Sequence, residues 1–215
     1  MTEFKFRVNQ QYRDKSNPRN IDDEFTRVLG LGTGGGIRHK VYSNIPELST
    51  LPAFVVIESS YKDSGYDDLF DSMNGILKYW GDSKANSKYI AQGLHAFHGN
   101  KILKKVKDLL DENQRSLIPP FLYFKRPKKG LVEFKGLLIP SGIKKVENFL
   151  SEDENGDQKK IENYFCKFDV LNENIVSTDW LMERVNAANL NQRDHLAPDQ
   201  WKNYMKGLNK RTIYV

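Results

Sequence analysis

Hydrophobic and polar residues alternate through the middle of the chain in the way that β-strands require. The short apolar run LPAFVVIESS, residues 51–60, predicts a buried strand. GILKYWGD, residues 75–82, alternates more strictly and places Trp80 and Asp82 on one face and Tyr79 on the other. Further strands are predicted at residues 119–126, 129–140 and 161–172, with a hairpin turn at PKKG between the first two.

Helical spacing appears in three later segments. In GNKILKKVKDLLDEN, residues 99–113, apolar residues recur every three or four positions, Asn100 is available as the N-cap, and the opposite face is rich in lysine. Residues 178–189, capped by Ser177, and residues 198–209 repeat the amphipathic arrangement. The polar first part of the chain predicts long loops with one or two short elements. The chain is therefore predicted to be an α+β protein with a central, mostly antiparallel sheet and a helical C-terminus.

The composition fits one globular domain over residues 1–215. With 39% hydrophobic and 12% aromatic residues, the chain can bury a sizeable core, which excludes global disorder. The one cysteine, Cys166, has no partner for an intramolecular disulfide, and no apolar run is long enough to span a membrane. The N-terminus lacks the apolar segment of a signal peptide. We therefore expect a cytoplasmic protein without a membrane partner.

Positive charge is concentrated in the centre of the chain. The net charge of +5 and the pI near 9.1 by themselves only lean towards an anionic partner. Residues 101–145, however, carry twelve Lys or Arg against four Asp or Glu, a net charge of +8, whereas the rest of the chain has a net charge of −3. The basic surface is therefore expected on the predicted helix and hairpin.

The stretch VLGLGTGGGIRHKVYS, residues 28–43, has glycines at the spacing of a dinucleotide-binding turn. Such a turn needs a helix directly after it, whose N-terminus faces the pyrophosphate. Val41 and Pro46 stand where that helix would lie, and no Gly-Lys-Ser/Thr follows the glycines. Two interpretations remain: a surface loop, or a mobile finger whose glycines allow close approach to another molecule.

The sequence contains no convincing motif for a catalytic or metal centre. His95 and His98 are three residues apart, but Cys166 is distant, so ordinary loop histidines explain them better. Glu133 and Lys135 match the end of the Glu-x-Lys pair of metal-dependent nucleases, yet strand alternation explains them better because no suitable Asp precedes them at a strand end. Neither a nucleophile elbow nor a Cys-His arrangement is present. We predict no catalytic residue, no metal and no cofactor.

Several short blocks of sequence, in a fixed order along the chain, belong together. They are GGIR (35–38), LPAFVVIESSY (51–61), ILKYWGD (76–82), HGNKIL (98–103), GLVEFKGLLI (130–139), ENYFCKFDVL (162–171) and WLMER (180–184). In this order they resemble the N-terminal SRA-like domain of AspBHI-type modification-dependent restriction endonucleases, relatives of the MspJI group. The resemblance spans about residues 25–186, and YWGD followed by GN and a leucine is its most specific pair.

The resemblance implies a fold, an SRA-like (PUA-like) twisted, partly closed β-barrel with flanking helices and a helical C-terminus. It also implies recognition of modified cytosine, 5-methylcytosine or a similar base, in double-stranded DNA by base flipping. We therefore expect residues 1–215 to form a single DNA-recognition domain with its family-like core at 25–186. The helices at 187–215 would lead towards the nuclease domain that the family normally carries separately. Whether this chain is itself an enzyme, and whether the full-length enzyme is a homo-oligomer, stays open.

A pocket for a flipped base needs flat aromatic faces and polar groups for the Watson–Crick edge. On the resemblance, Asp82 is the candidate acceptor for the cytosine amino group, which thymine lacks. Trp80 is the candidate wall of the pocket and Tyr61 its second stacking face. Tyr79 is also a candidate, although strand alternation directs it towards the core.

A basic surface and the glycine loop complete the predicted interface with DNA. The loop is expected to enter a groove with Arg38 as its probing side chain, while other cations contact phosphates. The loop residues are Gly35, Gly36, Ile37, Arg38, His39 and Lys40, and the predicted backbone contacts are Lys84, Lys101, Arg126, Lys128 and Lys129.

Two other functions are alternatives. One is a metal-dependent nuclease that uses Glu133 and Lys135 with Mg²⁺, and the other is a protein-interaction domain whose basic residues are ordinary surface. Cleavage of methylated DNA by this chain alone would favour the nuclease. Equal affinity for modified and unmodified duplexes would exclude base reading.

Overall fold

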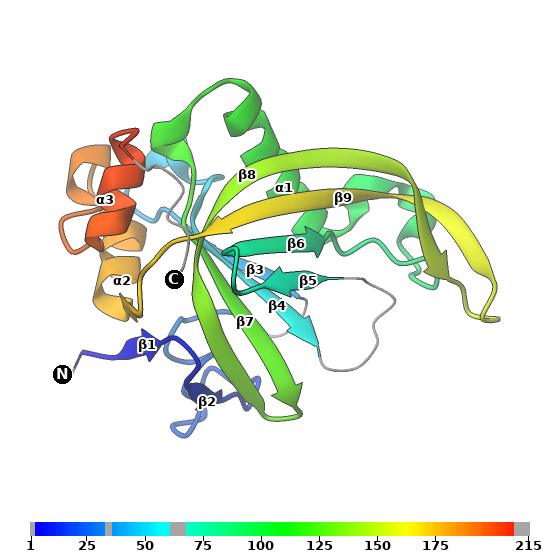
Figure 1. Cartoon of the computed structure of the whole chain (residues 1–215), viewed down its shortest axis with the longest axis horizontal. Coiled ribbons are helices and arrows are strands. Elements are labelled where there is room, and N and C mark those ends of the chain that lie inside the picture. The colour runs from blue at the N-terminus through cyan, green and yellow to red at the C-terminus, as the bar shows by residue number, and fades with distance from the viewer. Residues whose placement is uncertain (1–2, 33–35, 61–67, 209–215) are drawn as a thin grey trace.

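A computed structural model describes residues 3–32, 36–60 and 68–208, in which a curved eight-stranded sheet is flanked by three α-helices (Figure 1). The strands are β1 (Lys5–Arg7), β2 (Gln11–Arg13), β3 (Ile37–Val41), β4 (Pro52–Ser60), β5 (Leu69–Asp71), β6 (Ile76–Trp80), β7 (Phe121–Lys128), β8 (Leu131–Glu152), β9 (Gln158–Val170) and β10 (Ile175–Ser177). The helices are α1 (His98–Asp111), α2 (Thr178–Asn186) and α3 (Asp199–Met205), with 3-10 turns at Pro46–Leu48, Ile90–Gln92, Leu94–Ala96, Arg115–Leu117 and Leu190–Gln192.

The main sheet has the strand order β3-β4-β7-β8-β9-β6-β5, and β2 adds to β8. Strands β4 and β7 run parallel, and every other strand pair in the described residues is antiparallel. The edge strands β3 and β5 are not paired with each other, so the curved sheet is a partly closed barrel. The prediction of an α+β fold with a mostly antiparallel, partly closed sheet is confirmed.

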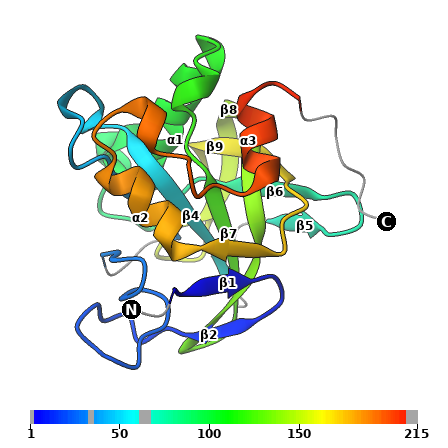
Figure 2. The ribbon, with the colours of Figure 1, turned by 90° about the vertical axis from the view of Figure 1, so that its left-hand side faces the viewer.

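The sheet separates two apolar cores because its central strands are buried on both faces. In β4, Phe54 and Val56 face one core, while Val55 and Ile57 face the other. The first core lies beneath α2 and α3, which sit together at one end of the sheet (Figure 2). The second lies beneath α1, whose buried stripe is the one that the sequence predicts. In the part of the chain that the structure describes, no helix is long and apolar enough to cross a membrane.

The two helix starts differ in how well the sequence predicts them. Ser177 caps α2 as expected, since its Oγ accepts a hydrogen bond from Asp179 N at 3.0 Å. Helix α1 begins at His98, so Asn100 lies inside the first turn and is not its N-cap. The residue before α1, Phe97, offers no capping side chain. The first amides of α1 donate instead to the carboxylate of Asp82, which follows β6.

Strands β8 and β9 continue beyond the rest of the sheet as a two-stranded arm, residues 145–164 (Figure 1). An extra residue in β8 after Val146 shifts the register, so that Phe149 lies opposite Ile161. The acidic stretch at 151–157, predicted as an exposed turn, forms the tip of the arm. The arm therefore extends from the end of β6.

Candidate nucleic-acid interface

A small cavity lies where β4 and β6 end, beside the start of α1. Its volume of about 170 Å³ is below the ~300–1,000 Å³ typical of sites for drug-sized ligands, so it suits a single flat ring. Five of the sequence-predicted residues meet in it, together with acidic and hydroxyl groups that the sequence does not single out. The lining residues are Gly36, Glu58, Ser60, Asp68, Tyr79, Trp80, Gly81, Asp82 and Lys84.

Tyr79 is held firmly at this cavity. Its side chain is buried, as strand alternation predicts, and its hydroxyl donates to the carbonyl oxygen of Glu58 at 3.1 Å. Burial raises the pKa of Tyr79 well above its ordinary value, so the hydroxyl stays protonated. A Cβ atom at Gly36 would lie 3.0 Å from this hydroxyl and 3.1 Å from the Glu58 carbonyl oxygen. The glycine at position 36 therefore allows close packing against Tyr79 and Glu58 at the cavity.

Trp80 lines the cavity, but its indole points to the other face of β6. The ring lies 4.7 Å from the ring of Phe149 and 5.0 Å from that of Phe165, between centroids. The main chain of Trp80 donates its N–H to Asp68 Oδ1 at 3.0 Å. The indole is therefore packed against Phe149 and Phe165, and its role as a wall of the pocket stays a prediction.

Asp82 caps helix α1. Its carboxylate oxygens accept hydrogen bonds from Gly99 N at 2.8 Å and Asn100 N at 3.0 Å, two of the amides that a helix start leaves without partners. The preceding Gly81 leaves room for this contact, since a Cβ there would lie 2.1 Å from Asn100 Oδ1 and 2.5 Å from Asn163 Oδ1. The YWGD and HGN blocks therefore contact each other directly, where the end of β6 meets the start of α1. Asp82 also lines the cavity, so its predicted contact with the base stays a prediction beside this capping role.

Asp68 is the carboxylate that the sequence reasoning missed. It precedes β5, and its oxygens accept hydrogen bonds from Trp80 N at 3.0 Å and Ser59 Oγ at 2.8 Å. It therefore lies at the cavity between the ends of β4 and β6. In the sequence it is one of several carboxylates in the stretch YKDSGYDDLFD, where no periodicity distinguishes it.

Two predicted DNA contacts belong instead to a buried ion network. Arg38 lies in β3, is only 7% exposed, pairs with Glu58 at 3.0 Å, and stacks 4.6 Å above the ring of Phe25. Arg126 donates to both oxygens of Glu58, at 2.7 and 2.9 Å, and pairs with Asp14. The prediction that Arg38 probes a groove is therefore wrong. Arg126 is likewise committed to internal carboxylates and is not a projecting phosphate contact.

The rest of the predicted glycine loop is mostly strand. Ile37 is buried and Lys40 is half-buried within β3, where Lys40 packs close to Gly30. Gly35 and Tyr61, predicted as a loop residue and a stacking face, lie outside the described residues. The predicted loop therefore does not project as a unit from the described part of the protein.

His39 faces the start of α1. Its ring lies 5.2 Å from the ring of His98, between centroids. Burial lowers the pKa of His39 to about 4, with a further contribution from His98 and Lys105. His39 is therefore neutral at pH 7 and adds no charge for a phosphate.

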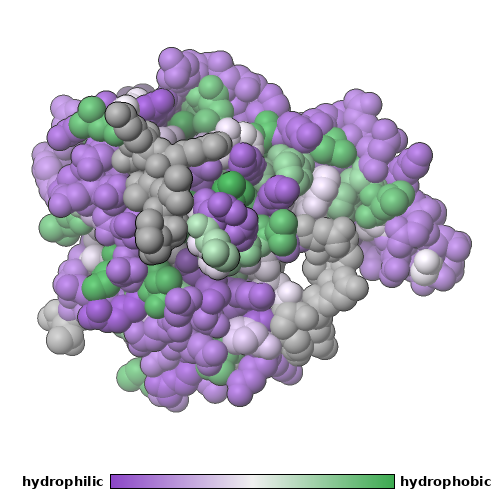
Figure 3. All heavy atoms as spheres, in the orientation of Figure 1, coloured by the Kyte–Doolittle hydropathy of each residue, from purple (hydrophilic) through white to green (hydrophobic). Residues whose placement is uncertain are grey.

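Exposed lysines lie on two sides of the cavity. Lys84 lines it, and Lys101 is exposed on the first turn of α1. On the other side, Lys125, Lys128 and Lys129 are exposed around the β7–β8 turn, which lies beside the end of β4 because β4 and β7 run parallel. Lys125 was not predicted. The face of the molecule shown in Figure 3 is mostly hydrophilic.

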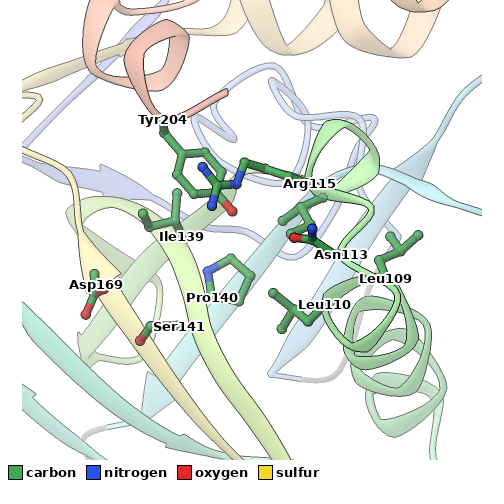
Figure 4. Close-up of a pocket in the computed structure, with 10 residues that line it drawn as sticks. Leu109, Leu110, Asn113, Arg115, Ile139, Pro140, Ser141, Asp169 and Tyr204 are labelled. Carbon is green, nitrogen blue, oxygen red and sulfur yellow. The ribbon is translucent and has the colours of Figure 1, made fainter. Parts of the chain in front are cut away.

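A second cavity, of about 270 Å³, lies between the end of α1, β8 and α3 (Figure 4). Arg115 lies over the ring of Tyr204, 5.5 Å from its centroid, on one side of it. None of the sequence-predicted site residues lines this second cavity, so we place no part of the DNA interface there. The lining residues are Leu109, Leu110, Asn113, Arg115, Ile118, Ile139, Pro140, Ser141, Asp169 and Tyr204.

Glu133 and Lys135, the alternative nuclease pair, neutralise each other on β8. Lys135 Nζ donates to Glu133 Oε1 at 2.6 Å and to Asn9 Oδ1 at 2.9 Å. Over residues 3–32, 36–60 and 68–208, no three His, Cys, Asp or Glu side chains are placed to hold a metal ion. The nuclease alternative therefore gains no support from this pair.

Known proteins with a similar sequence or structure include restriction endonucleases and their DNA-recognition domains. The family model described as "Restriction endonuclease AspBHI N-terminal" matches residues 6–215. The solved DNA modification-dependent restriction endonuclease AspBHI is similar, with 22% identity and a TM-score of 0.73 over 99% of this chain and 95% of that one. The DNA recognition domain of the cytosine modification-dependent restriction endonuclease LpnPI has 21% identity and a TM-score of 0.71, over 99% and 92% of the two chains.

A third structure, MspJI restriction endonuclease in complex with a 27-mer oligonucleotide, also matches. It has 21% identity and a TM-score of 0.71, and all of this chain covers 56% of that one. No curated protein sequence matches the chain. At these identities the likeness to solved structures shows a shared fold.

Proposed function

The chain belongs to the family of AspBHI-type restriction endonuclease N-terminal domains, and from this premise we propose that it recognises modified cytosine in double-stranded DNA by base flipping. The observation that carries the proposal is the cavity at the ends of β4 and β6, where Tyr79 and Asp68 meet beside exposed lysines. The LpnPI relative is described as a DNA recognition domain and the MspJI relative was solved with an oligonucleotide, which supports a DNA partner. In this function the chain is the specificity module of a modification-dependent restriction endonuclease.

The cavity offers the two kinds of contact that a flipped cytosine needs. Tyr79 supplies a rigid flat face, and stacking of a base on an aromatic ring contributes about 1–3 kcal/mol. Asp68 supplies acceptor oxygens for the amino group of cytosine, where thymine presents an oxygen that a carboxylate repels. Asp68 accepts hydrogen bonds from Trp80 N and Ser59 Oγ, which hold its carboxylate at the cavity.

Flipping costs a few kcal/mol, and the surrounding cations help to offset it. Lys84 at the cavity and Lys128 and Lys129 at the β7–β8 turn approach it from two sides. Such contacts bind all duplexes alike, whereas the cavity supplies the discrimination. Affinity and specificity are therefore assigned to different residues.

The test is a binding titration with two duplexes that differ only in one cytosine methyl group, each at two salt concentrations. We expect tighter binding of the methylated duplex at both, with affinity for each duplex falling as salt rises. Equal affinity at every salt concentration would reduce the function to general attraction for phosphate. A parallel incubation with Mg²⁺ and methylated plasmid tests the nuclease alternative, and cleavage by this chain alone would contradict a pure recognition role.

A further inference from the structure

Ile21 stands at the corner of an ordered surface turn. Its side chain is 81% exposed, the largest exposed fraction among the large hydrophobic residues that the structure describes. Asp23 N donates to Asn20 O at 3.0 Å and Asn20 N donates to Asn17 O at 3.0 Å, so two consecutive turns present Ile21 outwards. Asp22 N also donates to the side chain of Asn20 at 2.9 Å. The residue is thus held out from the surface by fixed backbone.

A buried carboxylate fixes the loop that carries Ile21. Asp23 is fully buried, and its Oδ2 accepts hydrogen bonds from Lys15 N at 2.9 Å and Asn17 N at 3.3 Å. Its Oδ1 accepts from Phe25 N and Arg27 N, both at 3.0 Å. Because the loop is ordered before it meets a partner, binding through it costs little conformational entropy.

The same loop is tied to the cavity. Asp14 N donates to Gly130 O at 2.9 Å, which places the start of the loop against the β7–β8 turn with its lysines (Figure 1). The Asp14 carboxylate pairs with Arg126, and Arg126 binds Glu58, which lines the cavity. The side chains of Asp14, Arg126 and Glu58 therefore connect the start of the loop to the proposed base site.

We propose that residues 15–22 form a second DNA-contacting loop, in which Ile21 packs against bases in the groove beside the flipped cytosine while Lys15 and Arg19 contact phosphates. This inference rests on the proposed function. Apolar side chains of this kind act as wedges between base steps in proteins that distort DNA. Lys15 and Arg19 are both exposed, and the adjoining β7–β8 turn adds further positive charge.

The matched control is Met73, which is 80% exposed on the β5–β6 turn, at the opposite end of β6 from the cavity. Ile21→Ser and Met73→Ser are compared on a methylated duplex, its unmethylated counterpart, and a methylated duplex with a mismatched base opposite the modified cytosine. Ile21→Ser is expected to weaken binding of the paired methylated duplex roughly tenfold, and Met73→Ser less than twofold. On the mismatched duplex the Ile21→Ser loss shrinks, because flipping an unpaired base costs less.

The outcomes separate the two claims. If the unchanged protein binds methylated and unmethylated duplexes equally, the proposed function fails. If it discriminates but Ile21→Ser behaves like Met73→Ser, only the loop inference is overturned. An Ile21→Ser loss of equal size on paired and mismatched duplexes would also overturn the wedge role. Equal melting temperatures of the two variants, expected for exposed positions, confirm that folding is unchanged.

Discussion

Asp82 and Asn100 bind each other reciprocally: Asn100 N donates to Asp82 Oδ1 at 3.0 Å, and Asp82 N donates to Asn100 Oδ1 at 3.1 Å. The pair joins the end of β6 to the first turn of α1 at the wall of the cavity. Asn100 also donates to Ser83 Oγ at 2.7 Å and is fully buried. The relationship explains why these residues stand together in the sequence blocks that carry the family resemblance.

Asp82→Ala is expected to destabilise the fold by about 1–2 kcal/mol, because the first turn of α1 loses its cap. Urea unfolding measures the loss. Asp108→Ala is the control: Asp108 is on the same helix but forms an i,i+4 pair with Lys104 at 2.6 Å, and such a surface pair contributes about 0.5 kcal/mol or less. Unchanged stability of Asp82→Ala would contradict the capping role, and lost discrimination between the duplexes would support its predicted contact with the base.

Asp68→Asn is expected to abolish the preference for modified cytosine while leaving affinity for unmodified duplex unchanged. In the methylated duplex the flipped cytosine is bound in the cavity, where the amide places a donor against the amino group of the base at a cost of about 1–3 kcal/mol. The unmodified duplex is held by phosphate contacts, which the substitution leaves in place. The fold should tolerate the change, because the Asn oxygen still accepts from Trp80 N and its amide can donate to Ser59 Oγ. Matched titrations against both duplexes, together with a melting curve, measure the two effects.

Asp71→Asn is the control for that experiment. Asp71 is the last residue of β5, the strand that Asp68 precedes, and it accepts hydrogen bonds from Asn74 at the β5–β6 turn. It does not line the cavity. A loss of preference in both variants would assign the effect to the strand and not to Asp68.

Local periodicity was sufficient for much of the fold. The buried run of β4, the alternation of β6 and the apolar stripe of α1 are set by neighbours within a few residues, so a single sequence predicts them. The opposite directions of Tyr79 and Trp80 follow from the same alternation. What alternation cannot tell is which of the two faces carries the cavity.

The polar contacts of the site depend on long-range pairing, which the sequence did not reveal. Arg38 meets Glu58 because β3 and β4 are antiparallel neighbours, and this turns a predicted probing side chain into a buried one. Asp82 meets Asn100 only because α1 packs against the end of β6. Asp68 becomes important through its hydrogen bond to Trp80 N, across the β5–β6 hairpin. No spacing within the chain distinguishes these partners in advance.

Lys128→Ala and Lys129→Ala are expected to weaken binding of modified and unmodified duplexes by the same factor. Both side chains are exposed at the β7–β8 turn and so contact phosphate without reading a base. Each substitution should reduce the slope of log affinity against log salt by about 1. The control is Lys160→Ala, an exposed lysine on the arm. A change in the preference between duplexes would contradict the assignment.

Arg38→Ala is expected to act on stability and not on the salt dependence of binding. Removing Arg38 costs about 1–3 kcal/mol, because Glu58 loses one donor in a poorly solvated site while it keeps both hydrogen bonds from Arg126. Urea unfolding tests the first effect, and binding at several salt concentrations tests the second. If Arg38→Ala were as stable as the unchanged protein and its affinity for DNA depended less steeply on salt, Arg38 would be a phosphate contact.

His39 makes stability depend on pH. Because burial lowers its pKa in the folded protein to about 4 from an ordinary value of 6.5, the unfolded chain binds a proton between these values that the folded chain does not. Stability should therefore fall as the pH drops from about 6.5 to 4, and His39→Gln should flatten that part of the curve.

The measurement is the urea midpoint at pH 7 and at pH 4.5 for both proteins. His195→Gln serves as the control, since His195 is a surface histidine whose side chain is 69% exposed. In His39→Gln the urea midpoints at pH 7 and pH 4.5 should lie closer together than in the unchanged protein. In His195→Gln their difference should be unchanged, because only His39 is packed against His98 and near Lys105. The same pH dependence in His39→Gln as in the unchanged protein would place the acid-sensitive group elsewhere in the fold.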